Sequence, residues 1–153
     1  MAGLFIVVPF LTWYFTWFGR DLSEQDIATY LGFSAKVTKV KRSMLQFLIT
    51  AKSEGKRVVG YGAPGKGNTL LNYCGIREDF LDYTVDRNPH KQGTYTPGTR
   101  IPIHEPSKIF ETKPDFVLIL PWNLTSEITK DMAGIRKWGG KFVVPIPDVR
   151  VID

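Results

Sequence analysis

The sequence predicts an α/β domain of three α/β/α layers built on a mostly parallel sheet and preceded by an N-terminal helical segment. Short runs rich in Val, Ile and Leu alternate with segments of helical periodicity, an order typical of parallel sheets covered by helices on both faces. A glycine-rich loop follows the first of these runs directly. The length of 153 residues suits one domain of this kind, and we place it at residues 21–153.

An apolar segment, residues 1–20, precedes the predicted domain. Residues 1–19 carry no charged side chain and are rich in aromatic residues. A membrane helix needs roughly 20 apolar residues, a length that this segment barely reaches, and the basic start of a signal peptide is missing. Three interpretations stay open: an apolar segment packed on the domain, an anchor to a membrane or partner, and a remnant without a selected role.

The apolar pattern places helices and strands along the rest of the chain. Helical spacing predicts a helix from Ser23, its expected N-cap, to Gly55, with residues 32–34 as a candidate division into two helices. Apolar and β-branched runs predict strands at 57–61, 80–85, 101–103, 115–120 and 141–146. Further helices are predicted from 68 to a stop at Gly75, at 106–111 and at 126–137. Because the run 101–103 contains a proline, we expect it at a sheet edge.

Composition bears on the classes of function. The net charge of +5 suits an anionic ligand such as a nucleotide, and equally suits solubility alone. The basic residues are scattered, without the dense run of a nucleic-acid-binding arm, so we expect no nucleic-acid partner. The single cysteine, Cys74, excludes an internal disulfide and indicates a reducing compartment, so we expect a cytoplasmic protein with Cys74 in its core. With His90 and His104 as the only histidines, we expect no metal site.

The loop after the first strand carries the pattern Gly60-x-Gly62-x-x-Gly65, which matches the dinucleotide-binding fingerprint of Rossmann-like domains. Its mechanism requires a tight turn, close approach of backbone N–H groups to a phosphate, and close packing of a helix on a strand; glycine serves all three. The helix after the loop directs its positive end at the same anion. Asp86 lies about 20 residues beyond the last glycine, where a ribose-binding acid is found.

Two sets of residues are candidates for ligand binding. The phosphate-binding set is Gly60, Gly62, Ala63, Gly65, Lys66, Gly67 and Asn68. The second set follows other predicted strands and comprises Asp86, Asn88, His90, Lys91, Trp122 and Asn123. Because the carboxyl ends of parallel strands meet at one edge of a sheet, we expect both sets, with residues 145–147, to share one pocket. No catalytic residue is assigned.

Each assignment has an alternative. The loop also nearly fits a P-loop, but Gly67 stands where Ser or Thr would hold Mg²⁺. It is otherwise a strand-to-helix turn that binds nothing. Asp86 alternatively caps the turn at Asn88. His90 is alternatively an exposed loop residue, and Trp122 a packed residue beside a helix N-terminus.

Several blocks of the sequence resemble the C-terminal domain of sugar C-methyltransferases. The most specific are residues 60–75 (GYGAPGKGNTLLNYCG), 82–93 (DYTVDRNPHKQG) and 138–147 (WGGKFVVPIP). Shorter blocks at 97–103 and 118–123 also match. Because the blocks occur in the family's order and spacing, the resemblance covers most of the chain from about residue 24 onward.

The resemblance implies a function shared with other domains. Family members methylate a carbon of a nucleotide-linked keto-sugar, of the dTDP-sugar type, using S-adenosylmethionine held in a middle domain. That middle domain also carries the catalytic base, and the C-terminal domain helps to anchor the nucleotide-sugar. We therefore expect this chain to bind a nucleotide-linked sugar, to hold no cofactor of its own, and not to catalyse methylation alone. A separate methyltransferase chain is then a candidate partner.

Other functions stay open on the sequence. One is a protein-interaction module, or a non-binding remnant, in which the apolar N-terminus docks on a partner or membrane and drives oligomer formation. Another is a small NAD(P)-binding oxidoreductase, which requires a catalytic Tyr/Lys or His pair that the sequence does not identify.

Overall fold

The computed structural model describes residues 24–153 and, along the first helix, side chains from residue 32 onward. The apolar segment 1–20 and the expected N-cap Ser23 lie outside the described residues. The chain divides into two units, Met1–Val37 and Thr38–Asp153. The sheet, its core and the candidate site all belong to the second unit.

Helix α2 (Glu24–Ser53) is continuous. The division expected at residues 32–34 is wrong, because a single glycine costs a helix only about 1 kcal/mol relative to alanine and the chain runs through Gly32. Within the second unit, Met44, Leu48 and Ala51 recur at helical spacing and are buried. This stripe attaches α2 to the core.

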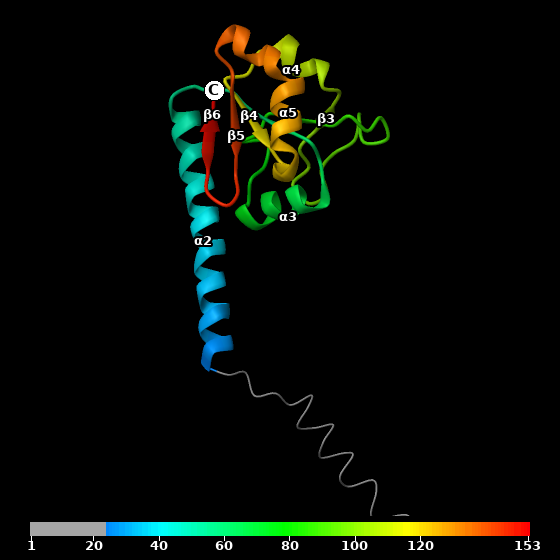
Figure 1. Ribbon diagram of the computed structural model, residues 1–153. Coiled ribbons are helices and arrows are strands. Elements are labelled where there is room, and N and C mark those ends of the chain that lie inside the picture. Colours follow the sequence, from blue (N-terminus) through cyan, green and yellow to red (C-terminus); the bar gives the residue numbers. More distant parts are fainter. Residues whose placement is uncertain (1–23) are drawn as a thin grey trace, which may run out of the picture. The chain divides into compact units, whose positions relative to one another are not determined.

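Within residues 24–153, six strands form one sheet in the order β3-β2-β1-β4-β5-β6. Strands β3 and β6 lie on opposite sides of β4 and β5 (Figure 1). The bounds of the six strands are β1 Val58–Tyr61, β2 Thr84–Val85, β3 Ile103–His104, β4 Phe116–Ile119, β5 Lys141–Val144 and β6 Arg150–Ile152. The first five pair in parallel, and β6 is antiparallel to β5. These pairings confirm the mostly parallel sheet and the edge position expected for the strand near Pro102.

Two strand predictions need correction. The run 80–85 forms a strand only at β2, because its first residue completes a turn and the chain joins the sheet from Thr84. Strand β6 was not predicted, since three residues carry little periodic signal and their pairing depends on a return of the chain beside β5. The other predicted strands form within a few residues of their expected bounds.

The helices follow the predicted order with one difference. Helix α3 (Gly65–Cys74) ends at Gly75 in a left-handed conformation, as expected, and α4 spans Ser107–Thr112. The helix expected at 126–137 is two pieces, α5 (Thr125–Asp131) and the 3₁₀ helix η2 (Ala133–Trp138). A short 3₁₀ helix, η1 (Trp122–Leu124), precedes α5. Within residues 24–153, no helix is both long and apolar enough to cross a membrane.

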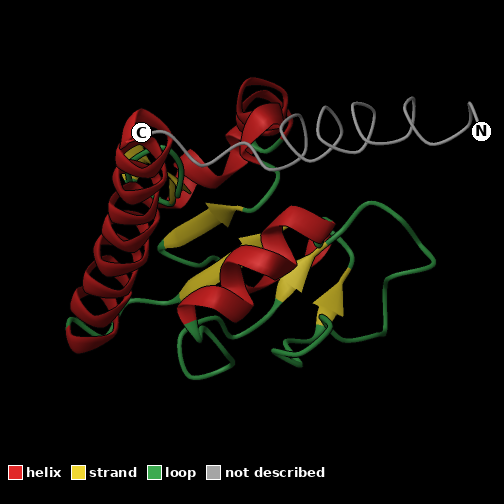
Figure 2. Ribbon diagram, turned by 90° about the horizontal axis from the view of Figure 1, so that it is seen from below, coloured by secondary structure: helices red, strands yellow, loops and turns green. Residues whose placement is uncertain are grey.

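Alternating side chains of the strands face two helical layers. Val58, Leu118 and Val143 are buried in one cluster with residues of α2 and α3, Cys74 among them. Their chain neighbours Val59, Val117 and Phe142 are buried in a second cluster with residues of α4, α5 and η2. Helices on either side of the strands are visible in Figure 2. The expected three α/β/α layers are confirmed.

The strand order also locates a crevice. Strands β1 and β4 are neighbours, but the chain leaves β1 for α3 on one face and leaves β4 for α5 on the other. Such a change of direction opens a crevice at the carboxyl ends of the strands, where ligands of open α/β sheets bind. The loops at 62–64 and 120–124 meet there.

Candidate functional site

A cavity of about 180 Å³ lies at this carboxyl edge. Backbone and side chains from three loops line it: Gly62 after β1, Asp86, Arg87 and Lys91 after β2, and Pro121 after β4. Helix α5 closes it with Glu127 and Ile128. Three of the predicted ligand-binding residues, Gly62, Asp86 and Lys91, therefore share one cavity.

The turn of the glycine loop is made by Gly62. Its φ is +85°, and a Cβ there would lie 2.7 Å from Cδ of Pro121. Gly60 instead lies inside β1, where a Cβ would lie 2.6 Å from the hydroxyl oxygen of Thr84. The tight-turn role that the fingerprint gives to its first glycine therefore belongs to Gly62.

The other two glycine roles are also displaced along the loop. A Cβ on Gly67 would lie 2.8 Å from Cβ of Leu120, so Gly67 permits the close approach of α3 to β4. A Cβ on Gly65 would meet no atom within 4 Å. The three roles of the fingerprint thus fall on Gly62, Gly65 and Gly67. Gly62 makes the turn, Gly65 leaves open space at the start of α3, and Gly67 allows α3 to pack closely on β4.

The N-terminus of α3 has donors without a capping group. The first N–H groups of a helix lack intrahelical acceptors, and here they belong to Gly65, Lys66 and Gly67. The N-cap residue Pro64 makes no side-chain cap, and the first turn holds no acidic residue. This end of α3 therefore presents unpaired donors and the positive end of the helix dipole to an anion.

Two other expected phosphate donors are already bound. The N–H of Gly62 donates to the carbonyl of Val85, and the N–H of Ala63 donates to Asp86 Oδ2 at 2.8 Å. In α3, Asn68 donates its N–H to the carbonyl of Pro64 at 3.0 Å, while its side-chain oxygen is buried without a partner. The remaining candidates for backbone donors to a phosphate are therefore Gly65, Lys66 and Gly67 in the first turn of α3.

Lys66, Trp122 and Asn123 come together on the loops after β1 and β4. The Lys66 ammonium donates to Asn123 Oδ1 and lies 4.6 Å from the centre of the Trp122 ring. Trp122 is half-buried and packs against both core clusters, so the packing alternative for this residue is confirmed. The trio fixes a positive charge in the first turn of α3.

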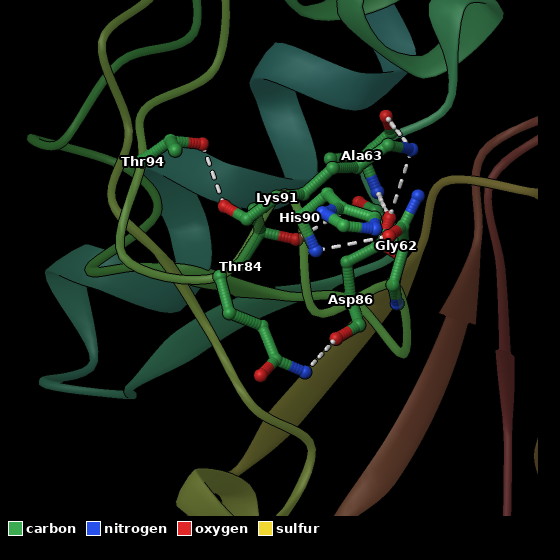
Figure 3. A network of polar contacts seen from close by, with 9 residues as sticks. Gly62, Ala63, Thr84, Asp86, His90, Lys91 and Thr94 are labelled. Carbon is green, nitrogen blue, oxygen red and sulfur yellow. Dashed lines mark hydrogen bonds and ion pairs between the residues drawn. The ribbon is translucent and has the colours of Figure 1, made fainter.

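Asp86 ties the end of β2 to the glycine loop (Figure 3). Its Oδ2 accepts the Ala63 N–H and the Lys91 ammonium at 3.3 Å, and its Oδ1 accepts the Asn88 N–H at 2.9 Å. Burial by itself raises the pKa of this carboxyl, but the N–H donors of Asn88 and Ala63 and the Lys91 ammonium outweigh it and lower the pKa below its usual range. Asp86 is a charged anchor of the loop.

The pKa of Asp86 gives a pH-dependent prediction. We expect Asp86→Asn to lower the free energy of unfolding by about 1–2 kcal/mol at neutral pH, because charged hydrogen bonds to Ala63 and Asn88 become neutral ones. Since the folded pKa is lowered, this stabilisation is complete above the unfolded pKa of about 3.9 and is lost as the pH falls through the folded pKa. Urea unfolding across an acid series measures it.

The matched control is Asp79→Asn, which removes a carboxylate from an exposed turn. The difference in unfolding free energy between the wild type and Asp86→Asn should begin to fall below about pH 4 and vanish as the pH falls through the folded pKa. Asp79→Asn should show no such difference from the wild type. A gap of constant size throughout the series would contradict the charged-anchor role.

Asn88 and His90 form a turn beside the cavity. The Asn88 side chain accepts the His90 N–H at 3.0 Å, and both residues are exposed. Asp86 therefore caps the turn at Asn88, and His90 is an exposed loop residue. Neither Asn88 nor His90 is among the residues that line the cavity.

Arg87 is the main site residue that the sequence interpretation missed. It donates to the Tyr61 hydroxyl at 3.0 Å and pairs with Glu127 at 3.0 Å and with Asp131. The bond to Tyr61, followed by the bond to Glu127, raises its pKa above the usual value. Its position next to Asp86 at a strand end was a signal, but its partners lie 40 and 44 residues away in the chain.

The expected pocket is therefore two adjoining parts. The cavity holds Gly62, Asp86 and Lys91, whereas Lys66, Trp122 and Asn123 cluster at the start of α3. Residues 145–147 are not among those that line the cavity. Among the described residues, no three His, Cys, Asp or Glu side chains gather as a metal-binding group.

The strand order, the glycine turn and the uncapped start of α3 define a Rossmann-like α/β domain. The particular family follows from comparison with known proteins. The chain belongs to the C-methyltransferase C-terminal domain family, whose model matches residues 20–147. The resemblance seen in the sequence blocks is confirmed.

A curated relative and a solved structure are among the proteins that are similar to the chain. C-methyltransferase NovU of Streptomyces niveus is 38% identical over 123 residues, which cover 80% of this chain and 29% of NovU. The chain thus spans less than a third of that relative. The crystal structure of UDP-D-quinovosamine 4-dehydrogenase from Vibrio fischeri is similar at 18% identity and a TM-score of 0.46, over 64% of this chain and 93% of that chain. That weak similarity carries no functional assignment.

Proposed function

We propose that this domain anchors a nucleotide-linked sugar for a sugar C-methyltransferase, without itself supplying catalytic groups. The observation that carries the proposal is the uncapped N-terminus of α3, with Lys66 fixed in its first turn, at the switch point of the sheet. Membership of a C-methyltransferase family and the match to NovU support a role in C-methylation, and the resemblance of the sequence blocks to sugar C-methyltransferases suggests the substrate class.

In this proposal the diphosphate is the anchored group. The N–H groups of Gly65, Lys66 and Gly67 would donate to its oxygens, and the Lys66 ammonium would add a charge-assisted contact. Asn123 and Trp122 would act by holding that ammonium beside the helix. Three backbone donors and one cation suit a diphosphate better than a neutral ligand.

The sugar would then lie in the adjoining cavity. Arg87, Lys91 and Glu127 line it and carry donors and acceptors that match sugar hydroxyls. Tyr61, Pro121 and Ile128 add apolar surface against the ring. A volume of about 180 Å³ is small, so only part of a nucleotide-sugar fits inside it.

S-adenosylmethionine is the methyl donor that family membership implies. The residues at the end of β2 do not fit its ribose, because three of the about four acceptor positions of the Asp86 carboxylate are taken and the Lys91 ammonium bridges Asp86 and the glycine loop. Asp86 Oδ2 already accepts two hydrogen bonds and Oδ1 accepts one. We infer that S-adenosylmethionine does not bind at the end of β2, and that another domain would hold it.

Removing the Lys66 ammonium tests the proposal. We expect Lys66→Met to weaken binding of dTDP by about tenfold and to reduce the dependence of affinity on salt, since one charged phosphate contact is lost. Calorimetric titration at two salt concentrations measures both effects.

Lys108→Met is the control, because it makes the same change in net charge as Lys66→Met. Lys108 lies on α4, which precedes β4 in the chain, and it is not among the residues that line the cavity. Its affinity for dTDP should stay within about twofold of the wild type. Equal losses in the two variants would mean that overall charge, and not the start of α3, attracts the nucleotide.

A further inference from the structure

Asp86 occupies the chain position of a ribose-binding acid but is committed to other partners. In dinucleotide-binding domains, the acid at the end of the second strand accepts hydrogen bonds from ribose hydroxyls. A carboxylate has about four acceptor positions. Asp86 uses three of them, for the Ala63 N–H, the Asn88 N–H and the Lys91 ammonium, and its side chain is only 14% exposed.

Lys91 fills the remaining space between the loop and the acid. Its ammonium donates to the Ala63 carbonyl at 3.0 Å as well as to Asp86, so it spans both sides of the gap that a ribose would enter (Figure 3). The same side chain lines the cavity. A ribose hydroxyl at this place would compete with Lys91 for the Asp86 carboxylate.

The same contacts hold the glycine loop. Gly62 is bonded on both sides, since its N–H donates to Val85 and its carbonyl accepts the buried Thr84 hydroxyl at 2.9 Å. Asp86 then fixes Ala63, two residues before α3 begins. Without the Asp86 contact, the Ala63 N–H loses its charged acceptor at the end of β2.

We propose that Asp86 and Lys91 have a positioning role and a specificity role. They hold the glycine loop in the conformation that binds phosphate, and they prevent the second nucleoside of a dinucleotide from binding at the end of β2. The site then accepts a single nucleoside diphosphate unit and rejects dinucleotides. This inference rests on the proposed function for its ligand, but the positioning role can be measured without any ligand.

The specificity role is tested by titrating the full chain with dTDP and with NAD⁺. We expect the wild type to bind dTDP and to bind NAD⁺ at least about a hundredfold more weakly. In Lys91→Met, which frees one acceptor position of Asp86 and removes the bridging ammonium, that preference should fall by about tenfold or more. Lys108→Met, the matched control, should keep the wild-type preference.

The positioning role is tested by hydrogen exchange of the Ala63 amide, followed by NMR without ligand. We expect exchange to speed up about tenfold or more in Asp86→Asn relative to the wild type and to Asp79→Asn, because the charged acceptor is lost. Unchanged exchange at Ala63 would overturn the positioning role.

The outcomes separate this inference from the proposed function. If the wild type binds dTDP and Lys91→Met keeps the full preference over NAD⁺, the specificity role is overturned while the proposed function stands. If the wild type binds neither nucleotide, the proposed function and the specificity role fail together. The positioning role is then decided by the hydrogen exchange of the Ala63 amide alone.

Discussion

Gly65→Val should abolish most nucleotide binding while leaving the fold intact. A Cβ at this position meets no atom within 4 Å, so the protein itself has room for the new side chain. Because Cα–Cβ bonds in a helix tilt toward its N-terminus, the added methyl groups occupy the space in front of the free N–H groups of α3. We expect affinity for dTDP to fall by about tenfold to a hundredfold, or about 1.4–2.8 kcal/mol.

The measurement pairs calorimetric titration with urea unfolding. The unfolding free energy of Gly65→Val should stay within about 1 kcal/mol of the wild type, since only a first-turn helix position changes. Gly65→Ala is an intermediate variant, with a smaller group in the same space, and its affinity should lie between the two. Undiminished affinity in folded Gly65→Val would remove the start of α3 from the ligand site.

Gly62→Ala should be among the most destabilising single changes in the loop. The residue has a φ of +85°, which costs a non-glycine residue about 1–3 kcal/mol, and its new Cβ would lie 2.7 Å from the Pro121 ring. Overpacking of this kind costs about 1–3 kcal/mol more. We expect a total loss of about 2–6 kcal/mol in the free energy of unfolding.

Gly75→Ala separates the two causes. Gly75 has a similar φ of +74°, but a Cβ there would meet no atom within 4 Å. Chemical denaturation should therefore show a smaller loss, of about 1–2 kcal/mol, due to the backbone conformation alone. Equal losses at the two glycines would show that Pro121 yields and that the crevice is not closely packed.

The features of the fold with strong local signals were predictable. The continuous apolar runs that become β4 and β5 are buried on both faces of the sheet, and this burial left a clear pattern in the sequence. The turn at Gly75 was equally plain. In contrast, strand β6 and the break between α5 and η2 near Met132 depend on how the chain returns over the sheet. Segments of three residues or of one helical turn carry too little local signal to predict such features.

The candidate site was predictable in position but not in its internal bonds. Strand ends predict this edge, because parallel strands bring their carboxyl ends together, and the structure has a cavity there lined by Gly62, Asp86 and Lys91. The shift of the turn role from Gly60 to Gly62 depends on Thr84 and Pro121, which approach from other strands. The ion pairs of Arg87 likewise join residues far apart in the chain. Spacing along the sequence cannot specify such contacts.

The commitment of Asp86 shows the same limit at a single residue. Its position after β2 is that of a ribose-binding acid, and nothing in the local sequence distinguishes that role from a loop anchor. The difference arises from the Ala63 amide, which reaches the carboxylate only after the loop has folded back on β2. The fingerprint spacing alone therefore does not show whether Asp86 is free to bind a ribose.

The most direct test of the anchoring role is a side-by-side calorimetric titration of the full chain with dTDP, a dTDP-sugar, S-adenosylmethionine and NADH. The account predicts binding of dTDP and tighter binding of the dTDP-sugar, with little or no binding of the two others. Preference for S-adenosylmethionine or NADH, or no binding of either dTDP ligand, would contradict it.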